Sequence, residues 1–156
     1  MANTFTNIVL HVIFAVKKAQ NKLPKDSREK LYHYLASAIN ERGHHTIEIG
    51  GTANHVHILF RYSGKELIEE LIRDLKSSST KFVNKEYLSP FLFGWQRGYA
   101  CFSANYNEYD QLQRYIKNQE QHHAHYQNRG LTLQEELKLL LKRADMTYDN
   151  RYLFED

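Results

Sequence analysis

The run of residues 55–62 alternates two kinds of side chain, and it constrains the fold more than any other feature of the chain. Val56 and Ile58 belong to an apolar set, which alternates with a second set that begins with His55 and His57. Because successive side chains of a strand point to opposite faces, this run predicts a half-buried strand. We expect the apolar set to face a hydrophobic core and the two histidines to stand side by side on the opposite face.

The segments around this run carry the periodicities of further strands and helices. Strands are expected over residues 4–16, 44–49, 55–62 and 99–104, and helices over 26–42, 63 to the mid-80s, 107–127 and 132–144. This order predicts an α+β, ferredoxin-like (βαββαβ) antiparallel sheet with helices on one face plus two C-terminal helices. We expect the other face of the sheet, which carries the histidines, to remain available.

Local signals predict where several of these elements begin and end. The spacing of an N-terminal helix cap occurs in Asp26 with Glu29, Ser63 with Glu66 and Thr132 with Glu135. A turn over residues 50–54 is expected to join two strands into a hairpin. The tail after Asp145 is expected to be irregular and to lie against the domain.

Composition excludes several classes of protein. A chain of 156 residues predicts a single domain over residues 1–156, and its one cysteine, Cys101, excludes a disulfide framework and a multi-cysteine zinc site. No uncharged apolar run approaches the roughly 20 residues of a membrane span, and no charged segment precedes the apolar N-terminal stretch. We therefore expect a cytoplasmic protein without a membrane partner. The net charge of +3 permits nucleic-acid binding without demanding it.

The two histidines are candidates for a metal site. His55 and His57 would lie roughly 7 Å apart along the strand, so both imidazoles can converge on one ion. The same pattern also fits two half-exposed histidines that bind nothing. A third, oxygen ligand from another element would leave positions open for water or substrate. Oxygen ligands favour Mg²⁺ or Mn²⁺, although imidazoles also suit zinc.

The expected helix over residues 107–127 can bring a phenol and an amide to one spot. Tyr115 and Gln119 are four residues apart, so they project from the same face of the helix. Other pairs with the same spacing are Tyr109 with Gln113 and Tyr106 with Asp110. Spacing alone does not choose between them, and it also fits a Tyr115 that only packs.

Several motifs follow one another along the chain and together point to a known family. They are His55-Val56-His57, then Trp95-Gln96-Arg97-Gly98-Tyr99, then the stretch from Tyr115 to His123, with His11 before them and Tyr148 to Leu153 after them. Together they resemble the HUH-type single-tyrosine transposases of small bacterial insertion sequences, including the related repeated-palindrome-associated tyrosine transposases. The similarity covers nearly the whole chain. Asn54 is a departure, because an acidic residue is expected before the histidine pair.

The resemblance implies a role for each part of the site. Tyr115 would be the nucleophile, His55 and His57 would bind a divalent metal ion (Mg²⁺ or Mn²⁺), and Gln119 would complete the metal site. The substrate would be single-stranded DNA with hairpin structure. The tyrosine would attack a phosphorus and release a 3′-hydroxyl, giving a 5′-phosphotyrosine, and strand transfer would follow without ATP. A homodimer is also implied, in which the tyrosine helix of one subunit can serve the histidines of the other.

Further residues are candidates for contacts with the DNA backbone, because short hydroxyl donors and cations suit phosphate oxygens. These candidates are Lys76, Ser77, Ser78, Ser79, Thr80, Lys81, Lys17, Lys18 and Arg97. The segment 76–81 also fits a solvated helix face. Three aromatic residues, Phe91, Phe93 and Trp95, can either stack on bases or pack in the core. His122, His123 and His125 resemble a second metal cluster, but we expect them to mark a solvated helix end.

Three alternative functions follow from the same residues. A non-catalytic module that binds single-stranded nucleic acid would carry exposed aromatic residues where this strand has His55 and His57. A domesticated relative would cut chromosomal palindromes with the same chemistry. A metal hydrolase of small phosphoesters is disfavoured, because no serine, threonine or carboxylate lies next to the histidines in the sequence.

Overall fold

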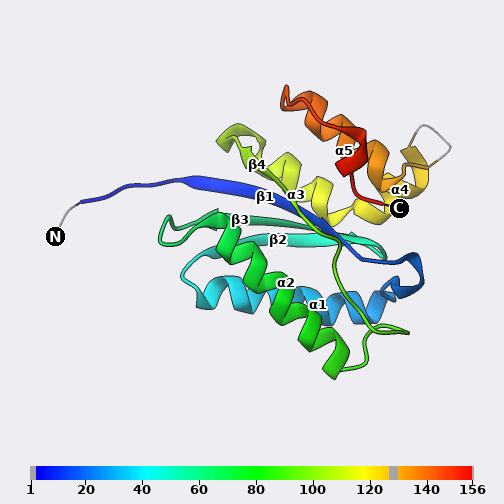
Figure 1. Cartoon of the computed structure of the whole chain (residues 1–156). Helices are drawn as coiled ribbons and strands as arrows, with labels where there is room; N and C mark the ends of the chain where they lie inside the picture. Colours follow the sequence, from blue (N-terminus) through cyan, green and yellow to red (C-terminus); the bar gives the residue numbers. More distant parts are fainter. Residues whose placement is uncertain (1–2, 127–129, 156) are drawn as a thin grey trace.

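A four-stranded antiparallel sheet forms the centre of the computed structural model, which describes residues 3–126 and 130–155 (Figure 1). The strands are β1 (Ile8–Ala15), β2 (His45–Thr52), β3 (His55–Tyr62) and β4 (Ala100–Ala104). They lie in the order β2-β3-β1-β4, and every neighbouring pair is antiparallel. With α1 (Lys25–Glu41) after β1 and α2 (Ile68–Lys85) after β3, the chain follows the predicted ferredoxin-like βαββαβ order.

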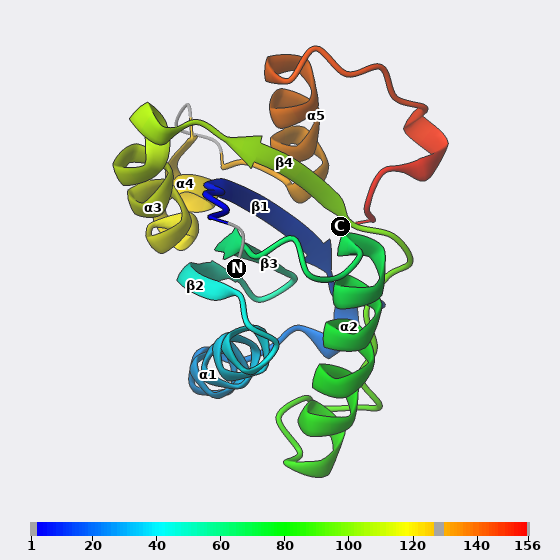
Figure 2. The ribbon, with the colours of Figure 1, turned by 90° about the vertical axis from the view of Figure 1, so that its left-hand side faces the viewer.

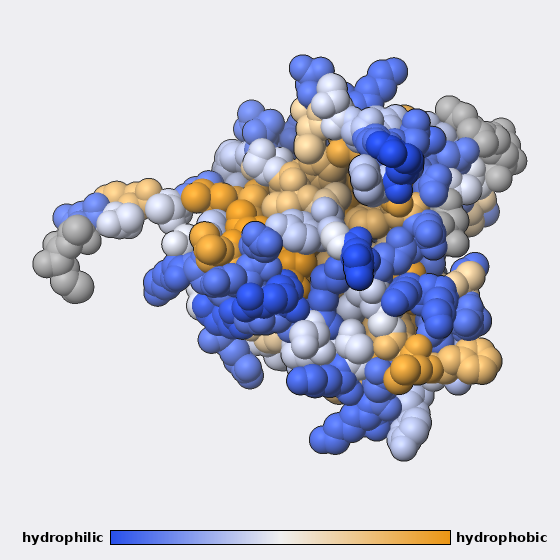
Figure 3. Space-filling model, in the orientation of Figure 1, coloured by the Kyte–Doolittle hydropathy of each residue, from blue (hydrophilic) through white to orange (hydrophobic). Residues whose placement is uncertain are grey.

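The helices α1 and α2 cover one face of the sheet, and the main hydrophobic core lies between these layers (Figure 2). The strands β1 and β3 contribute Leu10, Val12, Phe14, Val56, Ile58 and Phe60, and the two helices contribute Leu31, Leu35, Ile39, Leu71, Ile72 and Leu75. The apolar face predicted from the alternation in β3 is therefore confirmed. On the face shown in Figure 3, apolar side chains gather in a band across the middle of the molecule and in a separate patch at the lower right.

Three C-terminal helices cover the opposite face, which the sequence analysis expected to remain available (Figures 1 and 2). They are α3 (Tyr109–Lys117), α4 (Gln119–His125) and α5 (Leu133–Arg143). Apolar residues of α5 pack against Ile13 and Ala15 of β1 in a second core cluster. The expectation of an available face is wrong, because the amphipathic C-terminal helices bury their apolar sides against it.

Two helices replace the single helix predicted over residues 107–127. Asn118 interrupts it with backbone angles of φ −101° and ψ 25°, and α4 begins at the next residue. The expected end of this helix near residue 127 lies outside the described residues. The break turns Gln119 inward, where its side chain is buried.

Gly50 allows α3 to lie directly on β2. A Cβ atom at this position would lie 2.2 Å from the backbone oxygen of Ile116 in α3, which is too close for any side chain. The glycine belongs to the strand and not to the predicted turn, since β2 continues to Thr52. Only Ala53 and Asn54 connect β2 to β3, and Thr52 pairs with His55. The hairpin is confirmed with a turn shorter than predicted.

The capping predictions had different outcomes. Thr132 and Glu135 form a reciprocal capping box at the start of α5, as predicted. Neither α1 nor α2 has a side-chain cap, and α2 begins only at Ile68. Glu66, which lies just before α2, instead forms an ion pair with Arg42 at the end of α1. Only the end of the C-terminal tail lies against the domain: Phe154 is buried in the second core cluster, whereas residues 145–152 are exposed and include a short 3-10 helix at Asn150–Tyr152. None of the described helices has the length and apolar character of a membrane span.

Candidate active site

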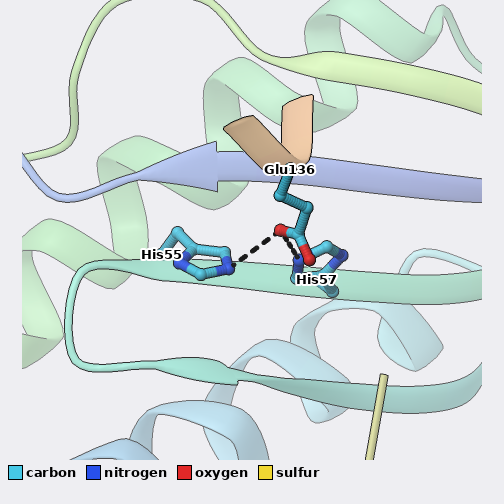
Figure 4. A group of neighbouring side chains, drawn as sticks. All are labelled: His55, His57 and Glu136. Atoms are coloured by element: carbon cyan, nitrogen blue, oxygen red, sulfur yellow. Dashed lines mark hydrogen bonds and ion pairs between the residues drawn. The ribbon is translucent and has the colours of Figure 1, made fainter. Parts of the chain in front are cut away.

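His55 and His57 lie side by side on β3, and both face a carboxylate that comes from α5 (Figure 4). The nearest oxygen of Glu136, Oε1, is 2.9 Å from His57 Nε2 and 3.3 Å from His55 Nε2. All three side chains are buried, and one candidate ligand atom from each lies within 4.8 Å of the others. This arrangement is a compact cluster of two imidazoles and one carboxylate, the donor types of many metal sites.

Sequence reasoning missed Glu136. The residue lies on the apolar side of α5 with Leu133 and Leu137, and all three are buried. A charged residue within the buried stripe of a helix is rare unless it is paired or bound to a metal ion. That mismatch between charge and position is the signal in the sequence that singles out Glu136 as a candidate site residue.

Tyr115 joins the cluster from α3. Its hydroxyl donates a hydrogen bond to Glu136 Oε2, and its ring lies edge-on to His57 with the ring centroids 5.8 Å apart. The tyrosines of the alternative pairs do not reach the histidines within the described residues: Tyr106 is exposed, and its ring contacts that of Tyr109. The structure therefore brings Tyr115, and not the other tyrosines of the alternative pairs, to the histidines.

Gln119 and His123 complete the inner part of the site from α4. Gln119 Oε1 lies 3.1 Å from His55 Nε2 and 3.1 Å from His123 Nε2. His123 Nε2 is also 3.2 Å from Glu136 Oε2. The prediction that His122, His123 and His125 mark a solvated helix end is wrong for His123, because the turn of α4 carries its side chain into the site; His125 is exposed.

Neighbouring polar groups fix the orientation of both β3 histidines. His55 Nδ1 lies 2.8 Å from Asn54 Oδ1 and 3.0 Å from Thr52 Oγ1, on the side away from Glu136. His57 Nδ1 and His11 Nε2 share a hydrogen bond of 2.7 Å. Asn54 therefore supports His55 with a neutral amide, where the resemblance leads us to expect a carboxylate.

Burial favours the neutral form of the His11 and His55 imidazoles, because it lowers the pKa of each. It lowers the pKa of His11 to about 3, with a further contribution from the charge of His57. Burial likewise lowers the pKa of His55 to about 4, against the opposing hydrogen bond to Glu136. Burial disfavours ionisation of Glu136, but the surrounding imidazoles outweigh it and hold the pKa of Glu136 below its usual range.

The pKa of the Tyr115 hydroxyl is raised well above its usual value. Burial is the largest cause, and the negative charge of Glu136 adds to it. Arg143, at the end of α5, acts in the opposite direction and lowers the pKa of Tyr115. In the arrangement seen here the phenol is protonated, and additional positive charge is needed to favour the phenolate.

The donor set fits a divalent cation. His55 has oxygens beside both ring nitrogens, with Asn54 Oδ1 on one side and Gln119 Oε1 and Glu136 on the other. The Thr52 hydroxyl can donate to Nδ1, but at Nε2 the oxygens of Gln119 and Glu136 have at most one His55 proton to share. A cation between these groups relieves that conflict. The two histidines, Gln119 and Glu136 together supply nitrogen and oxygen ligands that suit Mn²⁺, Mg²⁺ or zinc.

The residues predicted to contact DNA lie elsewhere, and the segment 76–81 belongs to α2 in the opposite layer. Lys76 Nζ donates to the backbone oxygens of Gln96 and Gly98, each at 2.7 Å. Ser79 is buried and its hydroxyl accepts a 2.9 Å hydrogen bond from Trp95 Nε1, so the prediction for Ser79 is wrong. The hydroxyls of Ser78 and Thr80 donate to backbone oxygens of their own helix.

The other candidates for DNA contact are on the surface but are not part of the site. Ser77, Lys81, Lys17, Lys18 and Arg97 are exposed. Of the three aromatic residues considered for base stacking, Phe93 and Trp95 pack in the main core and only Phe91 is exposed. These five polar residues remain predicted DNA contacts, separate from the cluster around Glu136.

Sequence comparison identifies the family. The model of the family described as IS200-like transposases matches residues 4–119, which is well over half of the chain. The chain is an IS200-like transposase. Its sequence is 26% identical over 114 residues to the ISDra2 transposase TnpA of Deinococcus radiodurans, an alignment that covers 70% of this chain and 81% of that protein. The family match ends at Gln119, before α5 and Glu136.

Solved structures share the fold of this transposase. A protein of Deinococcus radiodurans R1 described as a transposase superposes with a TM-score of 0.57 at 18% identity, covering 76% of this chain and 95% of that one. A REP-associated tyrosine transposase bound to a REP hairpin superposes with a TM-score of 0.54 at 13% identity. The superposition covers 74% of this chain and 68% of that one. At these identities the likeness concerns the fold of the chain.

Proposed function

We propose that this IS200-like transposase cuts and rejoins single-stranded DNA through a covalent bond between Tyr115 and a 5′-phosphate. The observation that supports it most strongly is the hydrogen bond from the Tyr115 hydroxyl to Glu136, which also contacts both β3 histidines. A nucleophile held within hydrogen-bond reach of an acceptor, which other groups orient in turn, is the typical arrangement for covalent catalysis. Metal assistance and the phosphotyrosine intermediate are part of this proposal.

The proposed step exchanges one phosphodiester for another. The bond between Tyr115 Oη and phosphorus forms while the bond from phosphorus to the 3′-oxygen breaks. The phenolic proton passes to Glu136 Oε2, the acceptor already in contact with it. The departing oxygen receives this proton from Glu136 by way of water and becomes a 3′-hydroxyl. A second 3′-hydroxyl then attacks the phosphotyrosine and joins new ends, so the bond is conserved and no ATP is consumed.

A divalent ion fits this chemistry, and His55, His57, Gln119 and Glu136 would hold it. When bound, Mg²⁺ or Mn²⁺ polarises a phosphoryl oxygen and stabilises the negative charge that develops in the transition state. The proposed step needs added positive charge, because ionising a phenol with a pKa of about 10 at pH 7 already costs about 4 kcal/mol. The surroundings of Tyr115 raise its pKa further, so positive charge from the ion and from Arg143 must offset this cost.

Hairpin DNA is the proposed substrate form, and the structural neighbour supports it, because that REP-associated transposase is bound to a REP hairpin. We also propose that the enzyme acts in the cytoplasm as a homodimer. In the structure, which holds one chain, Tyr115 contacts histidines of its own chain, and this contact favours a site formed within one subunit. A domesticated relative that cuts chromosomal palindromes would use the same residues.

A denaturing gel tests the proposal. Labelled single-stranded hairpin DNA is incubated with the protein and Mn²⁺, and a protein–DNA band that survives denaturation is expected. Tyr115→Phe and His55→Ala should both lose this band, because the first removes the nucleophilic oxygen and the second a metal ligand. Tyr109→Phe, on the same helix, should retain it. An undiminished band with Tyr115→Phe would show that the nucleophile is another residue.

Subunit mixing separates a site within one chain from a site shared between two. Tyr115→Phe and His55→Ala proteins are each expected to be inactive. If the site forms within one chain, a mixture of the two stays inactive, because neither subunit holds both groups. If the tyrosine helix serves the partner subunit, the mixture regains part of the covalent band.

A further inference from the structure

A groove runs across the surface beside Tyr115, between α3–α4 and α5. One hollow of about 500 Å³ is lined by Tyr115, His122, Tyr126, Glu136 and residues of α5. A second hollow, also of about 500 Å³, continues over α3 and α4 and shares Tyr115, His122 and Tyr126 with the first. The shared residues make the two hollows neighbouring parts of one groove, with Tyr115 at its middle.

Cations line both parts of this groove. Arg114 lines the part over α3, and Lys142 and Arg143 line the part beside α5. All three are exposed, and no ion pair joins any of them to a carboxylate within residues 3–126 and 130–155. The one carboxylate in the lining, Glu136, is buried and faces imidazoles. The groove therefore presents unpaired positive charge to solvent on both sides of Tyr115.

Flat rings lie between these cations. The ring centroid of His122 is 4.9 Å from that of Tyr115 and 5.6 Å from that of Tyr126, so three rings follow one another along the groove. Channels for single-stranded nucleic acid combine cations that follow the phosphates with rings on which unpaired bases stack. A duplex keeps its bases paired and stacked, so it cannot use such rings.

We propose that this groove is the path of the DNA strand that is cut, with Arg114 binding phosphate on one side of the reacting phosphorus and Lys142 and Arg143 binding phosphate on the other. The proposal rests on the proposed function, since it places the strand across Tyr115. It assigns half of the groove to α5, which lies beyond the residues that the family model matches. It also differs from the DNA-binding surface predicted on α2, which lies in the opposite layer of the fold.

Binding of a labelled, unstructured oligothymidylate, measured by fluorescence anisotropy, tests the groove. Tyr115→Phe serves as the parent protein, so that no covalent bond forms during the titration. At about 0.1 M salt, removing one phosphate contact to a single strand weakens binding about fivefold and lowers the salt slope by about 0.7. We expect this change for Arg114→Ala, and a larger change for the double variant Lys142→Ala/Arg143→Ala.

Matched controls decide which surface binds the strand. Lys30→Ala removes an exposed cation from α1, and binding should not change. Lys81→Ala removes an exposed cation from the predicted surface on α2. If Lys81→Ala weakens binding while the groove variants bind like their parent, the groove proposal is overturned. If an unlabelled duplex competes as well as the single strand, the assignment to a single strand is overturned.

The experiments can overturn the groove proposal and the proposed function independently of each other. Groove variants made with Tyr115 intact should form the covalent band more slowly at limiting DNA concentration. If the unmodified protein forms the band and the groove variants bind and react like it, the groove proposal fails and the proposed function stands. If the unmodified protein forms no band but the groove variants still bind the strand more weakly, the proposed function fails and the binding groove stands. Thermal melting of each variant verifies that it is folded.

Discussion

The two faces of the central sheet have opposite chemical character although one strand contributes to both. On one side of β3, Val56, Ile58 and Phe60 pack against α1 and α2 in the main core. On the other side, His55 and His57 meet a carboxylate and a phenol from the C-terminal helices. The first face gains its stability from apolar burial, whereas the second buries polar groups that stabilise the fold only if all of them are satisfied. We infer that the first face holds the fold and the second performs the chemistry.

Truncating a side chain on the apolar face should have the largest effect on stability. Phe60 is fully buried, so Phe60→Ala should lower the free energy of unfolding by about 3–5 kcal/mol. Chemical denaturation measures this change. The matched change on the other face, Tyr115→Phe, loses one hydrogen bond to a charged group and should cost at most about 1–3 kcal/mol. If Tyr115→Phe destabilised the protein more than Phe60→Ala, the division between the faces would be wrong.

Glu136 tests whether the second face binds metal. Glu136→Gln keeps the size of the side chain but removes its charge, so Mn²⁺ affinity should fall by about tenfold to a hundredfold, the loss known even for residues that only support ligands. Isothermal titration calorimetry measures the affinity. Asp110→Asn removes an exposed carboxylate from α3 and should leave it unchanged. Equal affinity in Glu136→Gln and the unmodified protein would exclude Glu136 as a ligand.

Acid should destabilise the histidine face of the metal-free protein. The pKa of His11 is lowered to about 3 in the folded protein, against 6.5 for an ordinary histidine. Between these pH values the unfolded state binds more protons than the folded state. Protonation of the histidine therefore does not reduce the free energy of unfolding above pH 6.5, but reduces it as the pH falls toward 3. The slope is up to about 1.4 kcal/mol per pH unit for each such histidine. Urea unfolding at several pH values with a chelator present measures this slope.

His11→Gln removes one of these titrating groups, so its stability should fall less steeply below pH 6.5. His33→Gln, at an exposed position on α1, should leave the slope unchanged. The same slope in all three proteins would mean that burial of His11 does not contribute to acid sensitivity.

Asn54 gives the smallest expected effect. Its amide oxygen faces His55 Nδ1 at 2.8 Å, so Asn54→Asp would place a carboxylate behind a proposed metal ligand. A carboxylate partner makes an imidazole a stronger ligand, and Mn²⁺ affinity should rise by up to about tenfold. Calorimetry against the unmodified protein measures the gain. Weaker binding by Asn54→Asp would show that the neutral amide is the better partner for His55 in this chain.

The apolar face could be predicted because its pattern is local. Alternation along residues 55–62 identifies both faces of β3, and helical periodicity identifies α1 and α2. The partners of the histidines depend on contacts between distant segments, since Glu136 is 79 residues beyond His57. Two local details also change the outcome: the break at Asn118 turns Gln119 and His123 inward, and Gly50 lets α3 lie on β2. Neither the break nor the close approach follows from hydrophobic periodicity.

The central claim is that Tyr115 forms the covalent bond to DNA. The most direct measurement is mass spectrometry of the covalent protein–DNA complex after digestion of both components. We predict that the nucleotide remnant is found on the peptide that contains Tyr115, attached through a 5′-phosphate to the tyrosine oxygen. A remnant on Tyr109, Tyr126 or any other residue, or one attached through a 3′-phosphate, would contradict the account.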